Sequence, residues 1–293
     1  MRKRYFGRAG LFILAMIFAS AFLLPTVLTF SNSFMTQSEI DTNYGMIFES
    51  TRPGVGSYVS DSVNLKFIPD IVSADQYITI LLKTPVYLLR FLNSVWLVFP
   101  IVIFQVGIAS FAAYSFTRYQ GPFKSFLFFF YIILMLMPYQ VTIVPNFIVA
   151  EWLGILGSRW AVFFPGIFAP FSVFLLTKFM RRIPSVLIEA AKLDGANEWQ
   201  IFTKICIPQC RSALYSIAIL VFIDYWNMVE LPIILLDDWE KQPLSVFLST
   251  INASEAGIAF AAAVVYMVLP LLLFLHGEEA LVEGITHSGS VKG

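Results

Sequence analysis

Two carboxylates stand in or beside an apolar stretch of the sequence. Asp224 lies inside the run of residues 214–236, and Glu230 lies nearer the end of that run. A charged side chain at the centre of a membrane helix costs about 2.5 to 3.5 kcal/mol on insertion scales, so it normally faces a cavity or a partner. Asp224 therefore either lines a polar cavity, or forms an interhelical hydrogen bond or lies near the external surface. For Glu230 we expect such a hydrogen bond or a position near the outer surface.

A second pattern combines small, charged and apolar residues in a way that suits protein docking. Its members are Glu189, Ala190, Ala191, Gly195, Ile205, Ile207 and Pro208. The alanines let another protein approach closely, Gly195 permits a sharp bend, and Glu189 offers a charge to a basic partner. The segment is too charged to cross lipid and too apolar to be left exposed, so it predicts a helix that fits a protein groove.

Helix start and stop signals punctuate this segment, residues 178–213. Pro184-Ser185 offers a helix start, Gly195 interrupts the helix, and Asn197 followed by Gln200 is typical of a capping box. Two short helices joined at a glycine are therefore expected. The alternative is an amphipathic helix that lies on a lipid surface.

Motifs for ATP hydrolysis and for metal or hydrolytic catalysis are absent from the sequence. No glycine precedes a lysine, which excludes the phosphate-binding loop, so the chain is not expected to hydrolyse ATP. His276 and His287 belong to no zinc-binding pattern, and there is no G-x-S-x-G motif. Cys206 and Cys210 have a spacing that suits one helix face, but no further Cys or His lies nearby, so no metal site is predicted.

The composition is that of a membrane protein. Of the 293 residues, 58% are hydrophobic and 13% are charged, against roughly 25% charged residues in a soluble domain. The formal net charge is zero, and without a basic excess nucleic acid is not an expected partner. Six apolar runs approach or exceed the length of a bilayer-spanning helix: residues 9–30, 88–116, 126–149, 160–177, 214–236 and 257–275. We predict an all-α polytopic protein of a single domain, whose first run is an uncleaved membrane helix.

Lysine and arginine orient these six helices, because cytoplasmic loops carry the excess of both. Thirteen of the 19 fall on the side of the two termini and five on the other, with Arg90 near a boundary. Both termini are therefore expected in the cytoplasm, together with residues 178–213 and the tail of residues 276–293. Residues 31–86 and 237–256 become external loops, and the first of these is expected to be irregular and without a core.

The docking pattern resembles the EAA loop of ABC import permeases: Glu-Ala-Ala, three residues, Gly, nine residues and Ile-x-Leu-Pro. Only Ile207 departs from it, by a conservative exchange for leucine. The resemblance covers nearly the whole chain and is closest to the smaller membrane subunit of maltose-type carbohydrate importers. Further matching stretches are residues 67–70 (FIPD), 93–94 (NS), 112–119 (AAYSFTRY), 137–145 (MPYQVTIVP), 173–184 (VFLLTKFMRRIP) and 225–227 (YWN).

This resemblance implies a subunit that forms half of the pathway for a sugar or oligosaccharide in the bacterial or archaeal inner membrane. It implies a second homologous permease, two cytoplasmic ATPase subunits that use ATP and Mg, an extracytoplasmic solute-binding protein and membrane lipid as partners. No cofactor is expected on this chain itself. The docking segment, now identified as a coupling loop between the fourth and fifth spans, would transmit the work of the ATPases.

Further roles follow from the same resemblance. The residues expected to line the pathway are Asp224, Tyr225, Trp226 and Asn227. The residues of the tail expected to contact the ATPase are Gly284, Thr286, Gly289, Lys292 and Gly293. Trp239 in the second external loop is expected to contact the binding protein, with a simple position at the membrane interface as the alternative.

Other classes of protein remain as alternatives: a permease for a non-sugar solute, an ion-coupled carrier or a membrane enzyme. An ion-coupled carrier would be expected to show inverted repeats and functional charges in broken helices. No segment of this chain is repeated, which favours the subunit driven by a separate ATPase.

Overall fold

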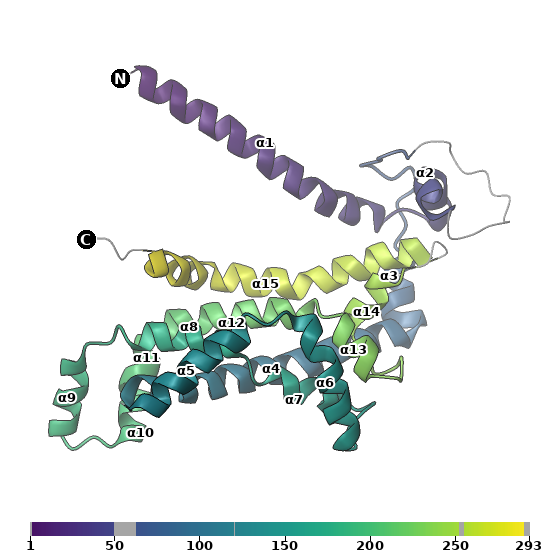
Figure 1. The fold of residues 1–293 in the computed structure, drawn as a ribbon. Helices are drawn as coiled ribbons and strands as arrows, with labels where there is room; N and C mark the ends of the chain where they lie inside the picture. Colours follow the sequence, from purple (N-terminus) through teal and green to yellow (C-terminus); the bar gives the residue numbers. More distant parts are fainter. Residues whose placement is uncertain (1, 50–62, 120, 252–254, 290–293) are drawn as a thin grey trace. The chain divides into compact units, whose positions relative to one another are not determined.

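A computed structural model describes residues 2–49, 63–119, 121–251 and 255–289, with side chains described for 10–44, 63–119, 121–251 and 255–278. Within these ranges the chain forms helices and no strand (Figure 1). The all-α fold predicted from the composition is therefore confirmed.

Four helical stretches are long and apolar enough to cross a membrane: Gly10–Asn32, Pro85–Arg118, Arg159–Met180 and Ala256–Glu278. Two bent pairs pass the same criterion, Pro122–Met135 with Tyr139–Trp152 at 104° and Glu198–Gln209 with Arg211–Trp226 at 75°. The described residues thus contain four spans, or up to six if each bent pair is one span. Six, the number expected from the apolar runs, is the upper value.

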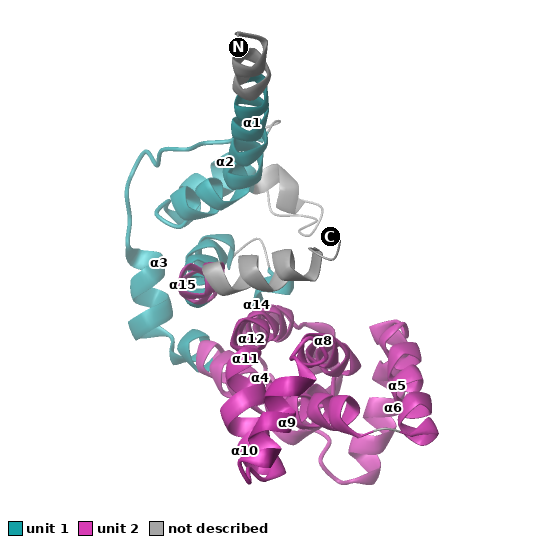
Figure 2. Cartoon of the chain, turned by 90° about the vertical axis from the view of Figure 1, so that its left-hand side faces the viewer, with its two compact units in different colours: residues 1–89, 247–269 teal, residues 90–246, 270–293 magenta. Residues whose placement is uncertain are grey.

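The chain divides into two compact units (Figure 2). Unit 1 comprises residues 1–89 and 247–269, and unit 2 comprises residues 90–246 and 270–293. Three helices contribute residues to both units: α4 (Pro85–Arg118), α14 (Leu244–Ser249) and α15 (Ala256–Gly289).

Unit 1 contains α1 (Arg2–Asn32), α2 (Gln37–Glu49), α3 (Asp75–Ile78) and the π-helix η1 (Thr79–Lys83). Its core joins Met35, Ile40 and Tyr44 to Ala256 of α15. The segment of residues 31–86 therefore differs from the irregular loop without a core that its composition predicts. Ile40 and Tyr44 are four residues apart, so they share one face of α2 and are both buried. Residues 51–61, whose composition most favoured a loop, lie outside the described residues.

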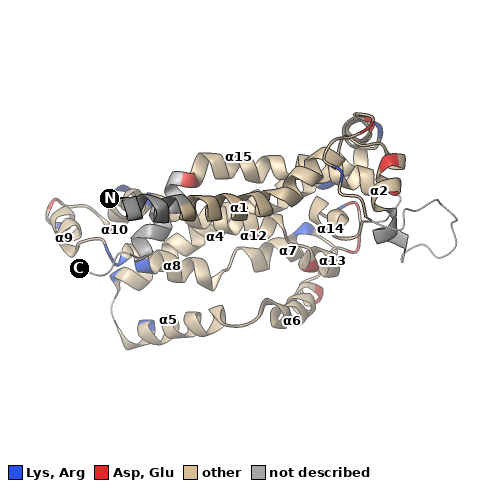
Figure 3. Cartoon of the chain, turned by 90° about the horizontal axis from the view of Figure 1, so that it is seen from above, with Lys and Arg blue, Asp and Glu red and all other residues tan. Residues whose placement is uncertain are grey.

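Unit 2 carries the remaining helices. They are α5 (Pro122–Met135), α6 (Tyr139–Trp152), α7 (Arg159–Gly166), α8 (Pro170–Met180), α9 (Ser185–Leu193), α10 (Glu198–Ile201), η2 (Phe202–Cys206), α11 (Ile207–Gln209), α12 (Arg211–Trp226) and α13 (Glu230–Leu235). Figures 1 and 3 both place α9 and α10 at one end of this unit and α6, α7 and α13 toward the other. The charged residues of unit 2 gather near helix ends, and the middle stretches are uncharged (Figure 3).

Proline explains where several predicted spans are interrupted. The run of residues 126–149 breaks before α6, where Pro138 has the extended ψ of 136°. The run of residues 160–177 divides into α7 and α8 before Pro170, because a residue that precedes proline avoids the helical region and Ala169 accordingly has ψ 115°. In the other direction, α15 continues past the expected end at residue 275 as far as Gly289.

Asn93 and Ser94 of α4 fasten the loop that follows α13. The Asn93 amide, 1% exposed, donates to the carbonyl oxygens of Glu240 at 2.6 Å and Gln242 at 3.2 Å. The Ser94 hydroxyl accepts from the backbone N–H of Leu244 at 3.0 Å. The loop thus gains three hydrogen bonds from two adjacent buried side chains, which gives the Asn93-Ser94 pair a structural role in unit 2.

Candidate functional site

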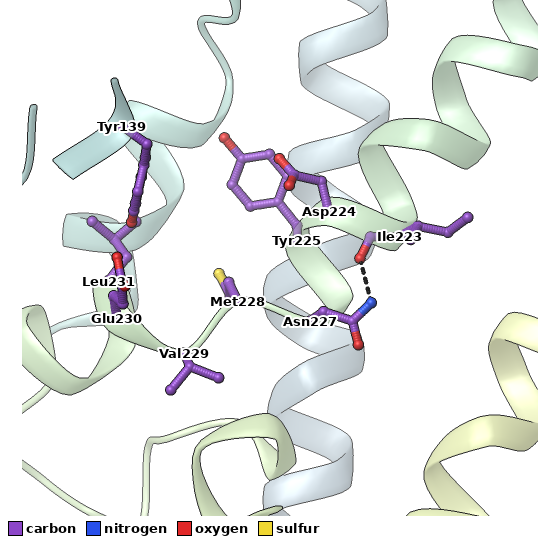
Figure 4. A pocket seen from close by; sticks show the side chains of 9 residues that line it. All are labelled: Tyr139, Ile223, Asp224, Tyr225, Asn227, Met228, Val229, Glu230 and Leu231. Carbon is purple, nitrogen blue, oxygen red and sulfur yellow. Dashed lines mark hydrogen bonds between the residues drawn. The ribbon is translucent and has the colours of Figure 1, made fainter. Parts of the chain in front are cut away.

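A cavity of about 570 Å³ in unit 2 collects most of the polar residues expected to line a pathway (Figure 4). Its walls include Asp224, Tyr225 and Asn227, together with Tyr139 and Glu230. In Figure 4, Tyr139 and Glu230 lie on one side of the cavity and Asp224 and Tyr225 on the other. Its size falls within the roughly 300 to 1,000 Å³ that is usual for small-molecule sites.

Interruptions of two helices create this cavity. The α5–α6 pair bends at the residues just before Tyr139, and α12 ends at Trp226 before α13 begins at Glu230. Irregular backbone at membrane depth is tolerated where it is buried in protein or lines a cavity, and transporters commonly build their sites at such breaks.

The two carboxylates are exposed to the cavity and available to a solute. Within the described part of the chain, neither Asp224 nor Glu230 forms a side-chain hydrogen bond or an ion pair. For Asp224 this arrangement matches a cavity wall rather than an interhelical hydrogen bond. Glu230, expected to lie in a hydrogen bond or near the outer surface, shares the wall with Asp224. An ionised carboxylate accepts hydrogen bonds through both oxygens, and hydroxyl groups are suitable donors to it.

Trp226 occupies a different place from its neighbours and does not line the cavity. Its side chain is 1% exposed, stacks on Phe222 at 5.1 Å and meets Phe91 of α4 edge-on at 5.8 Å. Trp226 points about 100° around α12 from Tyr225, so the two side chains face different ways, and Asn227 lies just beyond the end of the helix. The expectation that Trp226 lines the pathway is therefore corrected, since this residue packs between α4 and α12.

Two lining residues are not evident from the sequence alone. Tyr139 belongs to a matching stretch that carries no assigned role, although Pro138 before it is a usable signal. Proline in an apolar run interrupts the helix, and the first residues after such a break often border a cavity. Glu230 lies near the end of its apolar run, which favours a surface position, and the turn at residues 227–229 places it at the cavity across from Asp224.

The expected pair of short helices at a glycine is confirmed between α8 and α12. Helix α9 ends before Gly195, whose φ is +84°, a conformation that side-chain-bearing residues rarely adopt. Helix α10 begins with a complete capping box, in which the Asn197 side chain accepts from the Gln200 N–H at 2.8 Å and the Gln200 side chain accepts from the Asn197 N–H at 2.9 Å. We call residues 185–208 the coupling segment.

One face of the coupling segment is fixed to α4. Phe202 is 6% exposed and stacks on Phe111 of α4 with ring centroids 4.9 Å apart. The Tyr114 hydroxyl of α4 bonds to the Glu198 carboxylate, which also accepts a salt bridge from Lys192 at 2.7 Å. Because Lys192 and Glu198 lie on either side of Gly195, this ion pair links α9 to α10 across the turn.

The opposite face of the coupling segment is apolar and open. Leu193 is 90% exposed and Val186 69%, and their separation of seven residues places both on one face of α9, whereas Ile188 is buried at 3%. Trp199 is 62% exposed but belongs to the side of α4, where its ring stacks on Phe111 at 6.1 Å. Glu189 and Ala190 are also exposed, Ala191 is half-buried, and Glu189 forms no ion pair among the described residues. Two large exposed apolar side chains on so short a helix form a surface that suits a protein partner.

The last three positions of the expected docking pattern lie in η2 and α11, which follow α10. Ile205 and Ile207 are half-buried, and Pro208 is exposed. Ile205 lies in the π-helical turn η2, immediately before α11 and its proline. A π-turn is rare and often marks a functional position.

Two further expected sites stand apart from the cavity. Trp239 is 49% exposed, and the Arg90 guanidinium lies 5.5 Å from the centroid of its ring.

Of the tail, the backbone of Gly284, Thr286 and Gly289 belongs to α15, but no side chain beyond residue 278 is described. Lys292 and Gly293 lie outside the described residues.

A polar cavity at the breaks of apolar helices is typical of membrane transport proteins. The exposed face of the coupling segment adds a surface for a protein partner. Residues 105–277 match the family model of binding-protein-dependent transport system inner membrane components. The chain belongs to this family. It is thus a multi-pass membrane permease, and its family works with a solute-binding protein, a second permease and ATPase subunits.

Relatives of known description agree with this assignment. The arabinooligosaccharides transport system permease protein AraQ of Halalkalibacterium halodurans is 27% identical over 274 residues, which cover 92% of this chain and 98% of that protein. The osmoprotective compounds uptake permease protein GgtD of Synechocystis sp. is 32% identical over 208 residues, covering 69% of this chain and 70% of that protein.

The fold has a close counterpart among solved structures. A chain of a bacterial ABC transporter involved in the import of the acidic polysaccharide alginate superimposes with a TM-score of 0.74. The match covers 94% of this chain and 96% of that chain, at 22% sequence identity. At this identity the likeness establishes the ABC permease fold. Broken helices, which we expected of an ion-coupled carrier, thus occur in a chain of the binding-protein-dependent permease family.

Proposed function

We propose that this permease carries a sugar or oligosaccharide through the cavity between α6, α12 and α13. The observation that supports the proposal most strongly is the pair of carboxylates, Asp224 and Glu230, which face the cavity beside two tyrosines and have no partner among the described residues. Hydroxyl groups donate to carboxylates, and aromatic rings offer apolar faces to a sugar ring. The solutes named for relatives such as AraQ point to the same class.

The class of solute is tested on the cognate binding protein, because that protein presents the solute to the permease. Calorimetric titration with neutral sugars, compatible solutes and amino acids is expected to give binding only for carbohydrates or carbohydrate-derived compounds. The relative described as an uptake permease for osmoprotective compounds makes a non-sugar solute the second candidate. Amino acids or metal ions as the only ligands would contradict the proposal.

Replacement of Asp224 by asparagine is expected to slow transport without loosening the fold. The substitution keeps the size of the side chain and removes the charge, so it weakens charge-assisted hydrogen bonds worth about 1.5 to 3 kcal/mol. The maximal rate of sugar uptake at saturating loaded binding protein should fall about tenfold or more. Uptake is measured in proteoliposomes that contain the complete importer.

Glu151→Gln is the matched control for this experiment. Glu151 is an exposed carboxylate near the end of α6 and does not line the cavity. Its replacement should leave the rate of uptake unchanged. Equal rates for Asp224→Asn and the wild type would remove Asp224 from the pathway.

We also propose that the coupling segment docks into a groove of an ATPase subunit in the cytoplasm. The open apolar face formed by Val186 and Leu193 supports this role, and Glu189, which forms no ion pair among the described residues, can meet a basic partner. The distribution of lysine and arginine supports a cytoplasmic position for this segment and for both termini. Labelling of single cysteines from either side of the membrane tests the orientation, and a cysteine in the segment that reacts only from outside would reverse it.

The tail and the external loops are assigned by the same reasoning. We infer that residues 284–293 add to the contact with the ATPase and that Trp239 reaches the solute-binding protein. Deletion of the tail should lower the ATPase activity that the binding protein stimulates while membrane insertion persists, and unchanged stimulation would exclude the contact.

Single cysteines at residues 237–250 should crosslink to the binding protein in the nucleotide-trapped importer. Transport without any such crosslink would favour a simple membrane-interface position for Trp239.

A further inference from the structure

A second cavity in unit 2 has a composition unlike that of the solute cavity. Its volume is about 780 Å³, and it lies between α4, α7 and the loop after α13. Most of its wall is aromatic or aliphatic, and two cations complete it. The lining residues are Trp96, Leu97, Pro100, Phe104, Ser158, Arg159, Trp160, Phe163, Phe164, Ile167 and Lys241.

The apolar wall opens outward from unit 2. Trp96 is 69% exposed, Trp160 56% and Phe104 54%. The rings of Phe163 and Trp160 meet edge-on at 5.4 Å, and Phe104 meets Phe163 edge-on at 5.6 Å. In a membrane protein, tryptophan concentrates at the level of the lipid headgroups, with apolar side chains below it.

Arg159 is held at this cavity by a neutral partner. Its guanidinium donates to the Asn93 side-chain oxygen at 2.6 Å, and Asn93 is itself fixed by the carbonyls of residues 240 and 242. Within the described part of the chain, no carboxylate lies within ion-pair distance of Arg159. Its charge is therefore positioned but not neutralised. Guanidinium has five donors in a planar fork, which suits the oxygens of a phosphate.

Lys241 is the weaker of the two cations. Its ammonium lies 3.5 Å from the Asp238 carboxylate and donates to the Gly157 carbonyl at 3.3 Å. Asp238 thus offsets part of its charge, and Arg159 is left as the main contact for an anion.

We propose that this cavity binds a membrane glycerophospholipid, with its phosphodiester at Arg159 and an acyl chain along the aromatic wall. Charge complementarity selects the phosphodiester, because an arginine beside an apolar surface is costly unless an anion or water meets it. By the orientation proposed above, α7 and the loop after α13 face outward, since they lie at the end of unit 2 away from the coupling segment. The lipid therefore belongs to the outer leaflet.

The test uses the complete importer in nanodiscs that contain a phosphatidylethanolamine with a photoreactive acyl chain. In the wild type, labelled peptides should include Trp96, Phe104 or Phe163. Arg159→Gln should lower this labelling about tenfold, the effect of losing one charge-assisted hydrogen bond. Arg159→Lys should restore part of it, because lysine keeps the charge but not the fork.

Two further variants keep the result interpretable. Lys241→Gln leaves the hydrogen bond between Arg159 and Asn93 in place and should lower labelling less than Arg159→Gln does. Lys66→Gln is the control, because Lys66 is a cation of unit 1 that is paired with Glu39 and Asp70. It should leave labelling of the cavity unchanged.

Three outcomes would overturn the proposal. One is equal labelling of the cavity in Arg159→Gln and the wild type, and another is labelling that falls equally in Lys66→Gln. The third concerns the second permease subunit: a photoreactive residue in place of Trp96 that crosslinks to that subunit and not to lipid would make this face a protein interface.

Discussion

Replacement of Gly195 by valine should uncouple ATP hydrolysis from sugar uptake. Gly195 has φ +84°, and a side-chain-bearing residue in the left-handed region costs about 1 to 2 kcal/mol, with β-branched residues the least tolerated. Relief of this strain would move α9 relative to α10 and separate Lys192 from Glu198. A change of this size lowers the population of the native turn roughly fivefold to thirtyfold. Uptake in proteoliposomes should fall by a similar factor, while ATP hydrolysis persists and no longer responds to the binding protein.

Gly154→Val is a matched control, because Gly154 shares the relevant properties of Gly195. Its φ is +67°, and a Cβ added at either glycine would meet no neighbouring atom within 4 Å, so both variants carry backbone strain without a steric clash. Gly154 lies at the turn after α6 and not in the coupling segment. Its replacement should lower stability without uncoupling. If Gly195→Val assembles and transports like the wild type, the coupling role is wrong.

Trp226→Ala should destabilise unit 2 more than any substitution of a cavity-lining residue. The side chain is 1% exposed between Phe91 and Phe222, and removal of a buried aromatic ring costs about 3 to 5 kcal/mol. The thermal midpoint and the yield of the detergent-solubilised importer should both fall. The uptake that remains, divided by the amount of assembled importer, should stay near the wild-type value.

Asn227→Ala separates packing from transport at the neighbouring position. Asn227 is exposed at the cavity and makes one side-chain hydrogen bond, to the Ile223 carbonyl at 2.9 Å. Loss of this hydrogen bond should change the free energy of unfolding by about 1 kcal/mol or less.

If Trp226→Ala were as stable as the wild type but unable to transport, Trp226 would belong to the pathway after all.

The coupling segment was predictable from sequence because its signals are local. A glycine between two helices and an asparagine three residues before a glutamine each act within one turn of chain, and both predicted features are present. The apolar runs were equally readable as membrane helices. Their breaks were less so, because an apolar run gives the length of a span but not its bends.

The cavity was only partly predictable, because its walls come from distant parts of the chain. Asp224 and Tyr225 stood out as polar residues in an apolar run, but Trp226 shared that run and differs only in which way it points from α12. Its direction depends on the aromatic rings that surround it, including Phe91 of α4. Tyr139 comes from a helix more than 80 residues away, and no local pattern relates it to Asp224. The helical core of residues 35–44 was missed for a similar reason, since Ala256 completes it from the far end of the sequence.

The dependence of uptake on ATP and on the binding protein tests the central claim most directly. The importer is purified through a tag on this chain and reconstituted in proteoliposomes, with the ATPase subunits identified among the proteins that co-purify. Solute-loaded binding protein should stimulate ATP hydrolysis, and uptake should require ATP on the side of the membrane opposite the binding protein. Uptake driven by an ion gradient in the absence of ATP and of any co-purified ATPase would contradict the assignment.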